Sequence, residues 1–218
     1  MEPATLPPSS LIGFRIQLRK MRIALGNRLA SIPEDTEEAE LLRRLYAAFL
    51  DLEQAVGEQL FQQLSRNALY RSLTGLRGVG PSLAAELVCR IDLARAPSVR
   101  CLWRYAGLGV ADGRAERLMR GRKSAFNRKL RAACFVLATS LLRCHSPYAE
   151  EYYRTKPIYL CRGWSKAHAH RAAVRRMLKL FLAHLWEYGR RLQGLPTRRV
   201  TDLGAYGWPE VASGGFDP

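Results

Sequence analysis

The chain has 218 residues, 48% of them hydrophobic, and its 35 Lys and Arg residues against 19 Asp and Glu residues give a formal net charge of +16. This composition excludes a disordered tail and fits a folded protein of one or two domains. The excess positive charge favours a polyanionic partner, of which nucleic acid is the commonest, while the alternative is a protein that is basic without such a partner.

The sequence contains no apolar stretch long enough to predict a membrane span, and its N-terminal segment lacks the basic-then-apolar order of a signal peptide. Its five cysteines are widely scattered: Cys89, Cys101, Cys134, Cys144 and Cys161. They are typical of reduced, buried thiols, and their spacing to the histidines does not match a zinc site. We therefore expect a cytoplasmic protein with no metal site and no membrane partner.

In chain order, residues 1–10 are predicted to be a disordered leader, and residues 11–66 a long helical or coiled-coil region. A basic helix is expected over residues 11–32 and a second long helix after Pro33, with acidic residues near its start. Apolar residues recur in the second helix at Leu41, Leu42, Leu45, Phe49, Leu52, Val56, Leu60, Phe61 and Leu64. Two long helices with a short break indicate an antiparallel hairpin or a dimerising coiled coil, and packing on the next domain is an equal alternative.

Residues 67–91 are predicted to form a helix, a tight glycine-rich turn and a second helix. Gly78, Gly80 and Pro81 mark the turn, Ser82 is expected to cap the second helix, and Arg77 lies beside it. This pattern resembles a helix-hairpin-helix, in which glycines let the main chain approach a DNA phosphate and helix N–H groups bind it. The alternative is an ordinary helical hairpin whose glycines serve only the bend.

A short helix is expected over residues 98–107, followed by a loop or short hairpin over residues 107–124. The densest positive patch of the chain follows, opposed only by Glu116: Arg114, Arg117, Arg120, Arg122, Lys123, Arg128, Lys129 and Arg131. A run of like charges repels itself unless an anion fills it, so we interpret this patch as a phosphate-binding surface; a solvated loop is the alternative.

Residues 126–145 are predicted to form a buried helix whose basic first turn opposes the helix dipole, a conflict that a bound phosphate would relieve. A short segment with three tyrosines follows Ser146-Pro147. These rings are expected to pack on a neighbouring helix, and stacking on bases is the alternative.

The last helix is predicted over residues 165–192, with an apolar face that includes His184 as a satisfied core histidine. Cations are expected to cover its other side: Lys166, Arg171, Arg175, Arg176 and Lys179. Residues 193–218 are rich in Gly and Pro and are expected to form a loose tail.

The order of these segments carries a resemblance. The motifs are GNRLASI, LYRSLTGLRGVGPSLAAELVCRI, WRYAGLGV, NRKLRAACFVLATSLL, HSPYAEEYYRTK and AHRAAVRRMLKLFLAHLW. Together, over residues 12–190, the chain resembles the C-terminal half of the DEDD-type insertion-sequence transposases of the IS110 and IS116 group. The resemblance implies an all-α fold, with a helical DNA-binding domain over residues 67–192. It also implies a role in DNA transposition and recombination, a structured guide RNA as a second partner, and a prokaryotic, nucleoid-associated location.

The sequence departs from this family's pattern in two respects. The family's resolvase-like nuclease domain would lie before the basic helix, where residues 1–10 stand here. Magnesium is therefore expected only if a nuclease partner is supplied in trans. In addition, the family carries a nucleophilic serine in a Ser-Gly step after YAGL, and the matching step here is Asp112-Gly113. An aspartate cannot form a phosphoserine link, and Ser124 is a remote substitute that requires the loop to be re-registered.

The first hypothesis is therefore a transposase-family protein that binds DNA, and structured RNA, through backbone phosphates. The binding residues would be Arg77, Gly78, Gly80, Ser82 and the patch from Arg114 to Arg131. No strand cleavage is expected from this chain alone, and residues 11–66 are expected to associate with a second copy or with a full-length transposase. The second hypothesis is a domesticated DNA- or RNA-binding module without chemistry. The third is a structural assembly protein built on the coiled coil.

Overall fold

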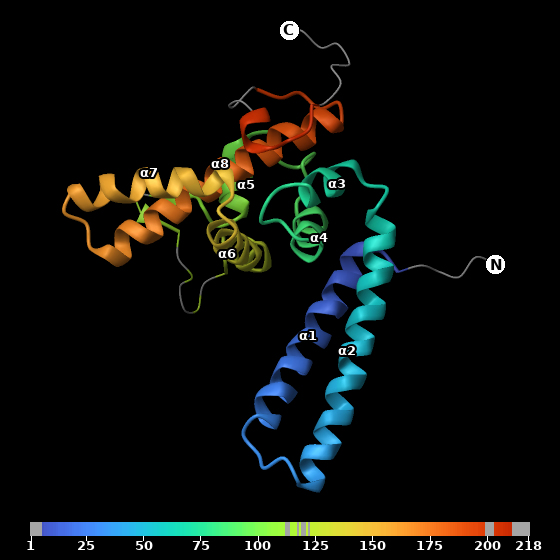
Figure 1. Ribbon diagram of the computed structural model, residues 1–218. Coiled ribbons are helices and arrows are strands. Elements are labelled where there is room, and N and C mark those ends of the chain that lie inside the picture. Colours follow the sequence, from blue (N-terminus) through green and yellow to red (C-terminus); the bar gives the residue numbers. More distant parts are fainter. Residues whose placement is uncertain are drawn as a thin grey trace. The chain divides into compact units, whose positions relative to one another are not determined.

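The computed structural model describes residues 6–111, 114–116, 118, 121, 123–198 and 203–210. Over these residues the chain forms eight α-helices, one short 3-10 helix and two strands of two residues each. This confirms the predicted all-α fold class. The chain divides into two compact units, Met1–Asn67 and Ala68–Pro218. Figure 1 shows the first unit in blue to cyan and the second in green to red.

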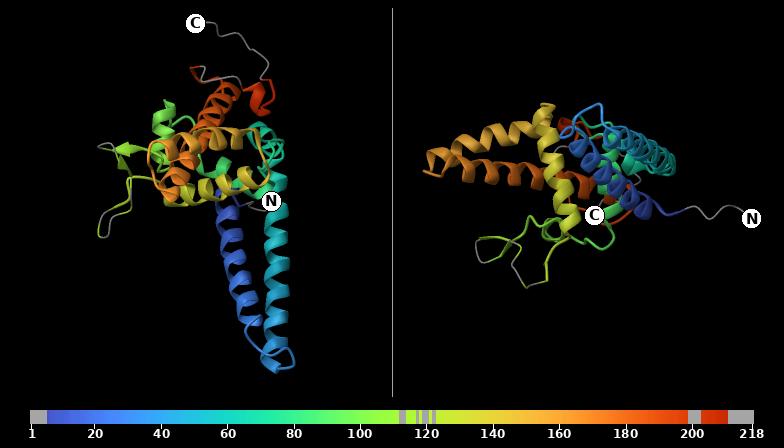
Figure 2. Two further views of the ribbon diagram at one scale, coloured as in Figure 1. Left: turned by 60° about the vertical axis from the view of Figure 1, so that its left-hand side comes forward. Right: turned by 90° about the horizontal axis from the view of Figure 1, so that it is seen from below.

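The first unit is a hairpin of two long helices, α1 (Pro8–Leu29) and α2 (Glu37–Leu64), which lie side by side in Figures 1 and 2. Helix α1 starts earlier than predicted, because Pro8 is suited to the first turn, where its missing N–H costs nothing. Helix α2 is capped by Thr36, whose Oγ1 accepts a hydrogen bond from the Ala39 N–H at 3.1 Å. Three glutamates in its first turn suit the positive end of the helix dipole.

Charge, as well as apolar packing, joins the two helices of the hairpin. The Glu53 carboxylate of α2 is buried and faces three arginines of α1, with Nε of Arg22 at 2.8 Å and the Arg15 and Arg19 guanidinium groups at 3.7 and 3.9 Å. Arg22 also donates to the Tyr46 hydroxyl at 2.9 Å. These bonds raise the pKa of Arg22 above its ordinary value, with the Glu53 hydrogen bond the largest cause.

The apolar stripe predicted for α2 divides between two faces of the helix. Leu60 and Leu64 are buried, as expected. Leu41, Leu45 and Leu52 are instead exposed, at 58%, 40% and 53%. The reason is that these three leucines are one position out of register with the face of α2 that meets α1.

The second unit is built around α8 (Lys166–Leu192), the longest helix in it. Its other helices are α3 (Ala68–Thr74), α4 (Pro81–Arg90), α5 (Val99–Tyr105), α6 (Arg128–Arg143) and α7 (Pro147–Cys161). Helix α8 packs against α3, α5, α6 and α7, and α7 lies along it as an antiparallel neighbour (Figure 2). Its C-terminal half is buried on nearly every side, which is the pattern of a central helix.

Side-chain caps fix the starts of these helices. Ser98, Asn127, Ser146 and Ser165 each accept a hydrogen bond from a backbone N–H in the first turn that follows. Helix α7 has 15 residues and continues through Pro157, so the segment after Ser146 is longer than predicted. Helix α6 is only partly buried, because Phe135 and Val136 are exposed at 68% and 61%.

Part of the C-terminal segment, residues 203–208, is packed against the second unit and is not the loose tail that was predicted there. A 3-10 helix, η1 (Gly204–Tyr206), is followed by Trp208, which is 4% exposed. Nε1 of Trp208 donates to the Tyr148 hydroxyl at 2.6 Å, and that hydroxyl lies 2.8 Å from Nδ1 of the fully buried His184. The fully buried His184 thus has a hydrogen-bond partner in the core, which confirms its predicted role as a satisfied core histidine. Burial of large aromatic surface outweighs the entropy of holding the segment in place.

Of the three tyrosines that follow Ser146, two pack inside the second unit as predicted. Tyr148 and Tyr152 are buried, and the Tyr152 hydroxyl pairs with Nδ1 of His170 at 2.8 Å. Tyr153 is 52% exposed and lies at the outer surface of α7.

Candidate nucleic-acid interface

The turn between α3 and α4 is held against α6 through Gly78. Its carbonyl accepts a hydrogen bond from the Ser140 hydroxyl at 2.7 Å, and its φ is +92°. A Cβ at this position would lie 3.3 Å from both Cα of Leu141 and the carbonyl oxygen of Ser140. Gly78 is therefore required for the packing of the turn against α6. A phosphate that approaches this turn would contact the neighbours of Gly78 and not Gly78 itself.

Those neighbours face solvent. Arg77 and Gly80 are exposed, and a Cβ added to Gly80 would meet no atom within 4 Å. Gly80 is also the N-cap of α4, with Pro81 in the first turn and no side-chain cap hydrogen bond from the cap residue. The prediction that Ser82 caps α4 is wrong, because the helix already begins at Pro81 and Ser82 lies inside its first turn. The result is an open helix N-terminus beside an arginine, a combination that attracts anions.

The second part of the candidate interface is the short hairpin that follows α5. Strand β1 (Val110–Ala111) pairs antiparallel with β2 (Arg114–Ala115), in the register Val110 opposite Ala115 and Ala111 opposite Arg114. Asp112 and Gly113, which match the family's Ser-Gly step, stand between these pairs in the sequence and lie outside the described residues.

Gly107 connects α5 to this hairpin and has no room for a side chain. Its φ is +71°, and a Cβ would lie 2.8 Å from the Phe126 ring and 2.9 Å from Cδ of Arg131. Beside it, Asn127 holds Tyr105 at two points: its N–H donates to the Tyr105 carbonyl at 2.9 Å and its Nδ2 donates to the hydroxyl at 2.7 Å. The YAGL segment and the start of α6 are thereby fixed to each other.

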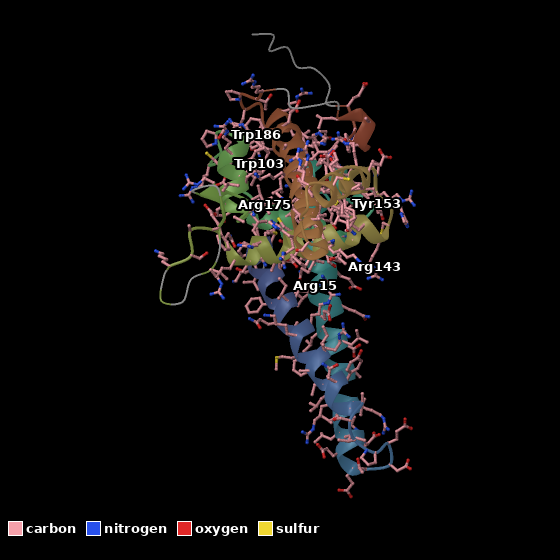
Figure 3. All side chains as sticks on the ribbon, turned by 90° about the vertical axis from the view of Figure 1, so that its left-hand side faces the viewer. Arg15, Trp103, Arg143, Tyr153, Arg175 and Trp186 are labelled. Carbon is pink, nitrogen blue, oxygen red and sulfur yellow. The ribbon has the colours of Figure 1, made fainter. Side chains whose placement is uncertain are left out.

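Two arginines hold the two arms of the hairpin. Arg175 of α8 donates to the Leu108 carbonyl at 2.7 Å and to the Gly109 carbonyl, on the arm that enters the hairpin. Arg131 of α6 donates to the Glu116 carbonyl at 3.2 Å, on the arm that leaves it. Figure 3 labels Arg175 beside α8, on the same side of the unit as Trp103 and Trp186.

These two arginines belong to a group of four cations at the base of the hairpin. We call it the cationic cluster, and it consists of Arg104, Arg131, Arg175 and Lys179. Burial lowers the pKa of Arg175, as does the nearby charge of Arg131, while Glu116 acts in the opposite direction. Burial and the charge of Arg175 likewise lower the pKa of Lys179. Lowered values mean that the charged forms of these groups are stabilised less than they would be in water.

Glu116 is the carboxylate in contact with the cationic cluster. Its Oε1 lies 4.0 Å from Nε of Arg104, and its side chain is 11% exposed. Its Oε2 is buried and makes no hydrogen bond with any residue that the structure describes. Among the described residues, one carboxylate thus accompanies four cations, which leaves this group with a net positive charge.

The other residues predicted to bind phosphate lie near the N-terminus of α6 or outside the described residues. Lys123, Arg128 and Lys129 are exposed, at or just before the first turn of α6. Asn127 caps that turn by accepting from the Leu130 N–H at 3.0 Å, so the helix end has a protein cap beside its cations. Arg117, Arg120 and Arg122 lie outside the described residues, and of Arg114 only the backbone is described.

Ser124, the remote candidate nucleophile, uses its hydroxyl in a local turn. Oγ donates to the Phe126 carbonyl at 2.8 Å and accepts from the Phe126 N–H at 3.3 Å. Among the described residues, no group of three or more His, Cys, Asp or Glu side chains is placed to hold a metal ion. None of the described helices is long and apolar enough to cross a bilayer.

Helix α6 joins the two parts of the interface and also separates them. It contacts Gly78 through Ser140 and carries the exposed cations at its first turn, twelve residues earlier. At 1.5 Å per residue this spacing is about 18 Å along the helix axis. The two predicted sets of phosphate contacts are therefore separated by about 18 Å along α6.

Sequence reasoning missed the contribution of α8 to this surface. Arg175 and Lys179 were expected only to cover the side of the last helix opposite its apolar face. Both are partly buried: Arg175 binds the base of the hairpin and Lys179 lies over the Trp103 ring. Their spacing of four residues places them on one side of the helix, and this was the available signal. It does not reveal that the segment at Leu108 and Gly109, 66 to 67 residues earlier than Arg175, packs on that side.

The sequence was compared with protein families, curated proteins and solved structures. Residues 70–154 match the model of the family described as Transposase IS116/IS110/IS902. The matched segment begins within α3 and ends within α7, so it contains the turn at Gly78, the short hairpin and the whole of α6. No curated protein and no solved structure matches the chain. The resemblance to the C-terminal part of these transposases is thus confirmed over residues 70–154, and this similarity supports a role related to transposition.

Proposed function

We propose that the second unit binds DNA through backbone phosphates in the course of transposition or recombination. The observation that carries this proposal is the cationic cluster at the base of the hairpin, in which Glu116 is the carboxylate that faces Arg104 and Arg175 among the described residues. Holding uncompensated charge in a partly buried place costs free energy, as the lowered pKa of Arg175 and of Lys179 indicates. A phosphate brought to this surface would offset that cost.

The open N-terminus of α4 beside Arg77 supplies a second anion position in the same domain. Contacts of this kind reach phosphate oxygens and not base edges, so they position a duplex without reading its sequence. Structured RNA offers the same phosphates, and it is the second nucleic acid that this surface would accept. The proposed activity is binding and not strand transfer, because Asp112 stands where the family has its nucleophilic serine.

The first unit supplies a second candidate role, that of an association module. Besides the face that meets α1, helix α2 has an outer face on which exposed residues recur at spacings of four and three: Leu41, Leu45, Ala48, Leu52 and Ala55. This spacing is typical of a coiled-coil seam, and a second copy of the same hairpin presents the same residues. We propose that two copies associate along it, with a full-length transposase of the same family as the alternative partner.

The phosphate-binding proposal is tested by salt dependence. The variant Lys123→Gln/Arg128→Gln/Lys129→Gln removes three exposed cations, and we measure its affinity for a labelled DNA duplex by fluorescence anisotropy across a salt series. The slope of log affinity against log salt should decrease by up to about 0.9 for each lost phosphate contact. The control is Arg43→Gln/Arg44→Gln, which lowers the charge of the first unit and should leave the slope unchanged. An unchanged slope in the triple variant would remove these residues from the interface.

The association proposal has its own measurement. The variant Leu45→Lys/Leu52→Lys places charge on the outer seam, and sedimentation of the full chain should then show a monomer where the unaltered chain is a dimer. The control is Gln54→Lys, which adds charge to α2 at an exposed position outside the seam. If the unaltered chain sediments as a monomer, the seam is not a self-association surface.

A further inference from the structure

The second unit contains a groove that the phosphate-binding surface does not use. It lies between the segment that enters α5 and the segment that follows α8, and its volume is about 810 Å³. Its lining includes two tryptophans, two arginines and two prolines: Trp103, Trp186, Arg100, Arg198, Pro97 and Pro196. Figure 3 shows Trp103 and Trp186 near each other on one side of the unit. Sites for small organic ligands have volumes of about 300–1,000 Å³, so the groove has room for a nucleotide.

Hydrogen bonds fix the walls of this groove. Nε1 of Trp103 donates to the Lys179 carbonyl at 3.0 Å, and Nε1 of Trp186 donates to the Ala96 carbonyl at 2.7 Å. Arg190 joins the two flanking segments, since it donates to the Leu93 carbonyl at 2.7 Å and to the Pro196 carbonyl at 2.9 Å. Both indole rings and both segments are thus held before any ligand arrives, which lowers the entropic cost of binding.

The chemistry of the lining is aromatic and positive. Arg100 and Arg198 are exposed at its rim, and no Asp or Glu is among the residues that line it. Trp186 is 3% exposed and forms part of the floor, whereas Trp103 is only half-buried. Nζ of Lys179 lies 4.8 Å from the centre of the Trp103 ring, which adds positive charge beside it.

We propose that this groove binds a single-stranded segment of nucleic acid, with an unpaired base against Trp103 and its adjoining phosphates on Arg100 and Arg198. Every base offers a π-face, so stacking on tryptophan is tolerant of sequence. A base inside a duplex has both faces covered by its neighbours, and the groove therefore selects unpaired strands. This inference rests on the proposed nucleic-acid-binding function and adds a site with a different preference to it.

The experiment compares strand types on the full chain. Fluorescence anisotropy is measured with labelled oligothymidylate, oligouridylate and a DNA duplex, using Trp103→Leu and, separately, Arg100→Gln/Arg198→Gln. Trp103→Leu should weaken binding of the single strands about 5- to 150-fold, the range for loss of one stacking contact, and weaken duplex binding much less, because Lys179 keeps its charge. The arginine pair should lower the single-strand salt slope by about 0.7 for each lost contact.

Matched controls separate the groove from general effects. Trp164→Leu removes a tryptophan outside the groove, between α7 and α8, and Arg43→Gln/Arg44→Gln removes the same charge from the first unit. If Trp103→Leu does not fold, the exposed arginine pair still tests the groove, and ultraviolet cross-linking of a 5-iodouracil oligonucleotide should label the peptide that contains Trp103 or Trp186. Cross-links confined to other peptides would overturn the assignment.

The outcomes also separate this inference from the proposed function. If the unaltered chain binds the duplex and neither single strand, the groove assignment fails and the phosphate-binding proposal stands. If it binds none of the three, both fail. Loss of affinity for only one of the two single strands supports the site and shows whether it prefers DNA or RNA.

Discussion

Replacement of Gly107 by Ala should destabilise the second unit through two effects that the structure separates. A left-handed backbone costs an L residue about 1–2 kcal/mol. The added Cβ would also lie 2.8 Å from the Phe126 ring and 2.9 Å from Cδ of Arg131, inside the range that forces neighbours to move. Overpacking of this kind costs about 1–3 kcal/mol, so the total expected loss is about 2–5 kcal/mol.

A matched control isolates the contact from the backbone strain. Gly163 has a φ of +79°, close to the +71° of Gly107, but a Cβ there would meet nothing within 4 Å. Gly163→Ala should therefore lose only the backbone contribution of about 1–2 kcal/mol. The difference between the two variants measures the packing of the YAGL segment against Phe126 and Arg131.

The assay is urea unfolding followed by tryptophan fluorescence. All four tryptophans (Trp103, Trp164, Trp186 and Trp208) lie in the second unit, so the signal reports on that unit alone. At about 2–4 °C per kcal/mol for a unit of this size, thermal unfolding should give a drop of about 4–20 °C for Gly107→Ala. Equal losses in both variants would show that Phe126 and Arg131 do not confine this position, and the described geometry of the hairpin base would be wrong.

Three further predictions concern contacts that stabilise each unit from within. Burial raises the pKa of Glu151, but its hydrogen bonds to Arg154 and Arg176 outweigh this and lower the pKa below the ordinary 4.5. Its stabilising effect is therefore present above that value and is lost as the pH falls through the lowered one, so Glu151→Gln should flatten the acid limb of a stability-against-pH curve; an identical limb would refute it. Glu53→Gln leaves three arginines facing a neutral amide and should destabilise the hairpin of α1 and α2 by about 1–3 kcal/mol, measured by circular dichroism of the full chain. Trp208→Ala should cost about 3–5 kcal/mol in urea unfolding, whereas Trp164→Ala, at an exposed position, should cost less than about 1 kcal/mol, and similar losses would show that the C-terminal segment does not pack as described.

The predicted helices followed from local physical chemistry. Serine and asparagine caps, glycines after helix ends and apolar residues at helical spacing are properties of neighbouring residues, and they act before any long-range contact forms. For this reason the helices near residues 99–105, 128–143 and 166–192 lie close to where the sequence placed them. The same local pattern could not tell which of the two apolar stripes of α2 meets α1, because that choice depends on the partner helix.

In the candidate interface, too, some features are visible in the sequence and others depend on contacts between distant residues. The run of cations from Arg114 to Arg131 is visible in the sequence, and so is the glycine-rich turn at Gly78. That Gly78 packs on Ser140, that Arg175 binds the Leu108 carbonyl and that Trp103 lies near Trp186 are facts about residues 62 to 83 positions apart.

By itself, then, the sequence determined the fold class, the sign and density of charge, and the order of motifs that resembles this transposase family. Only the tertiary structure decided which cations are held together around one carboxylate, which glycine is needed for packing and which is open, and that the segment around Trp208 is buried. The physical reason is that charge and helix propensity are carried by single residues and short windows, whereas burial and desolvation exist only where distant segments meet.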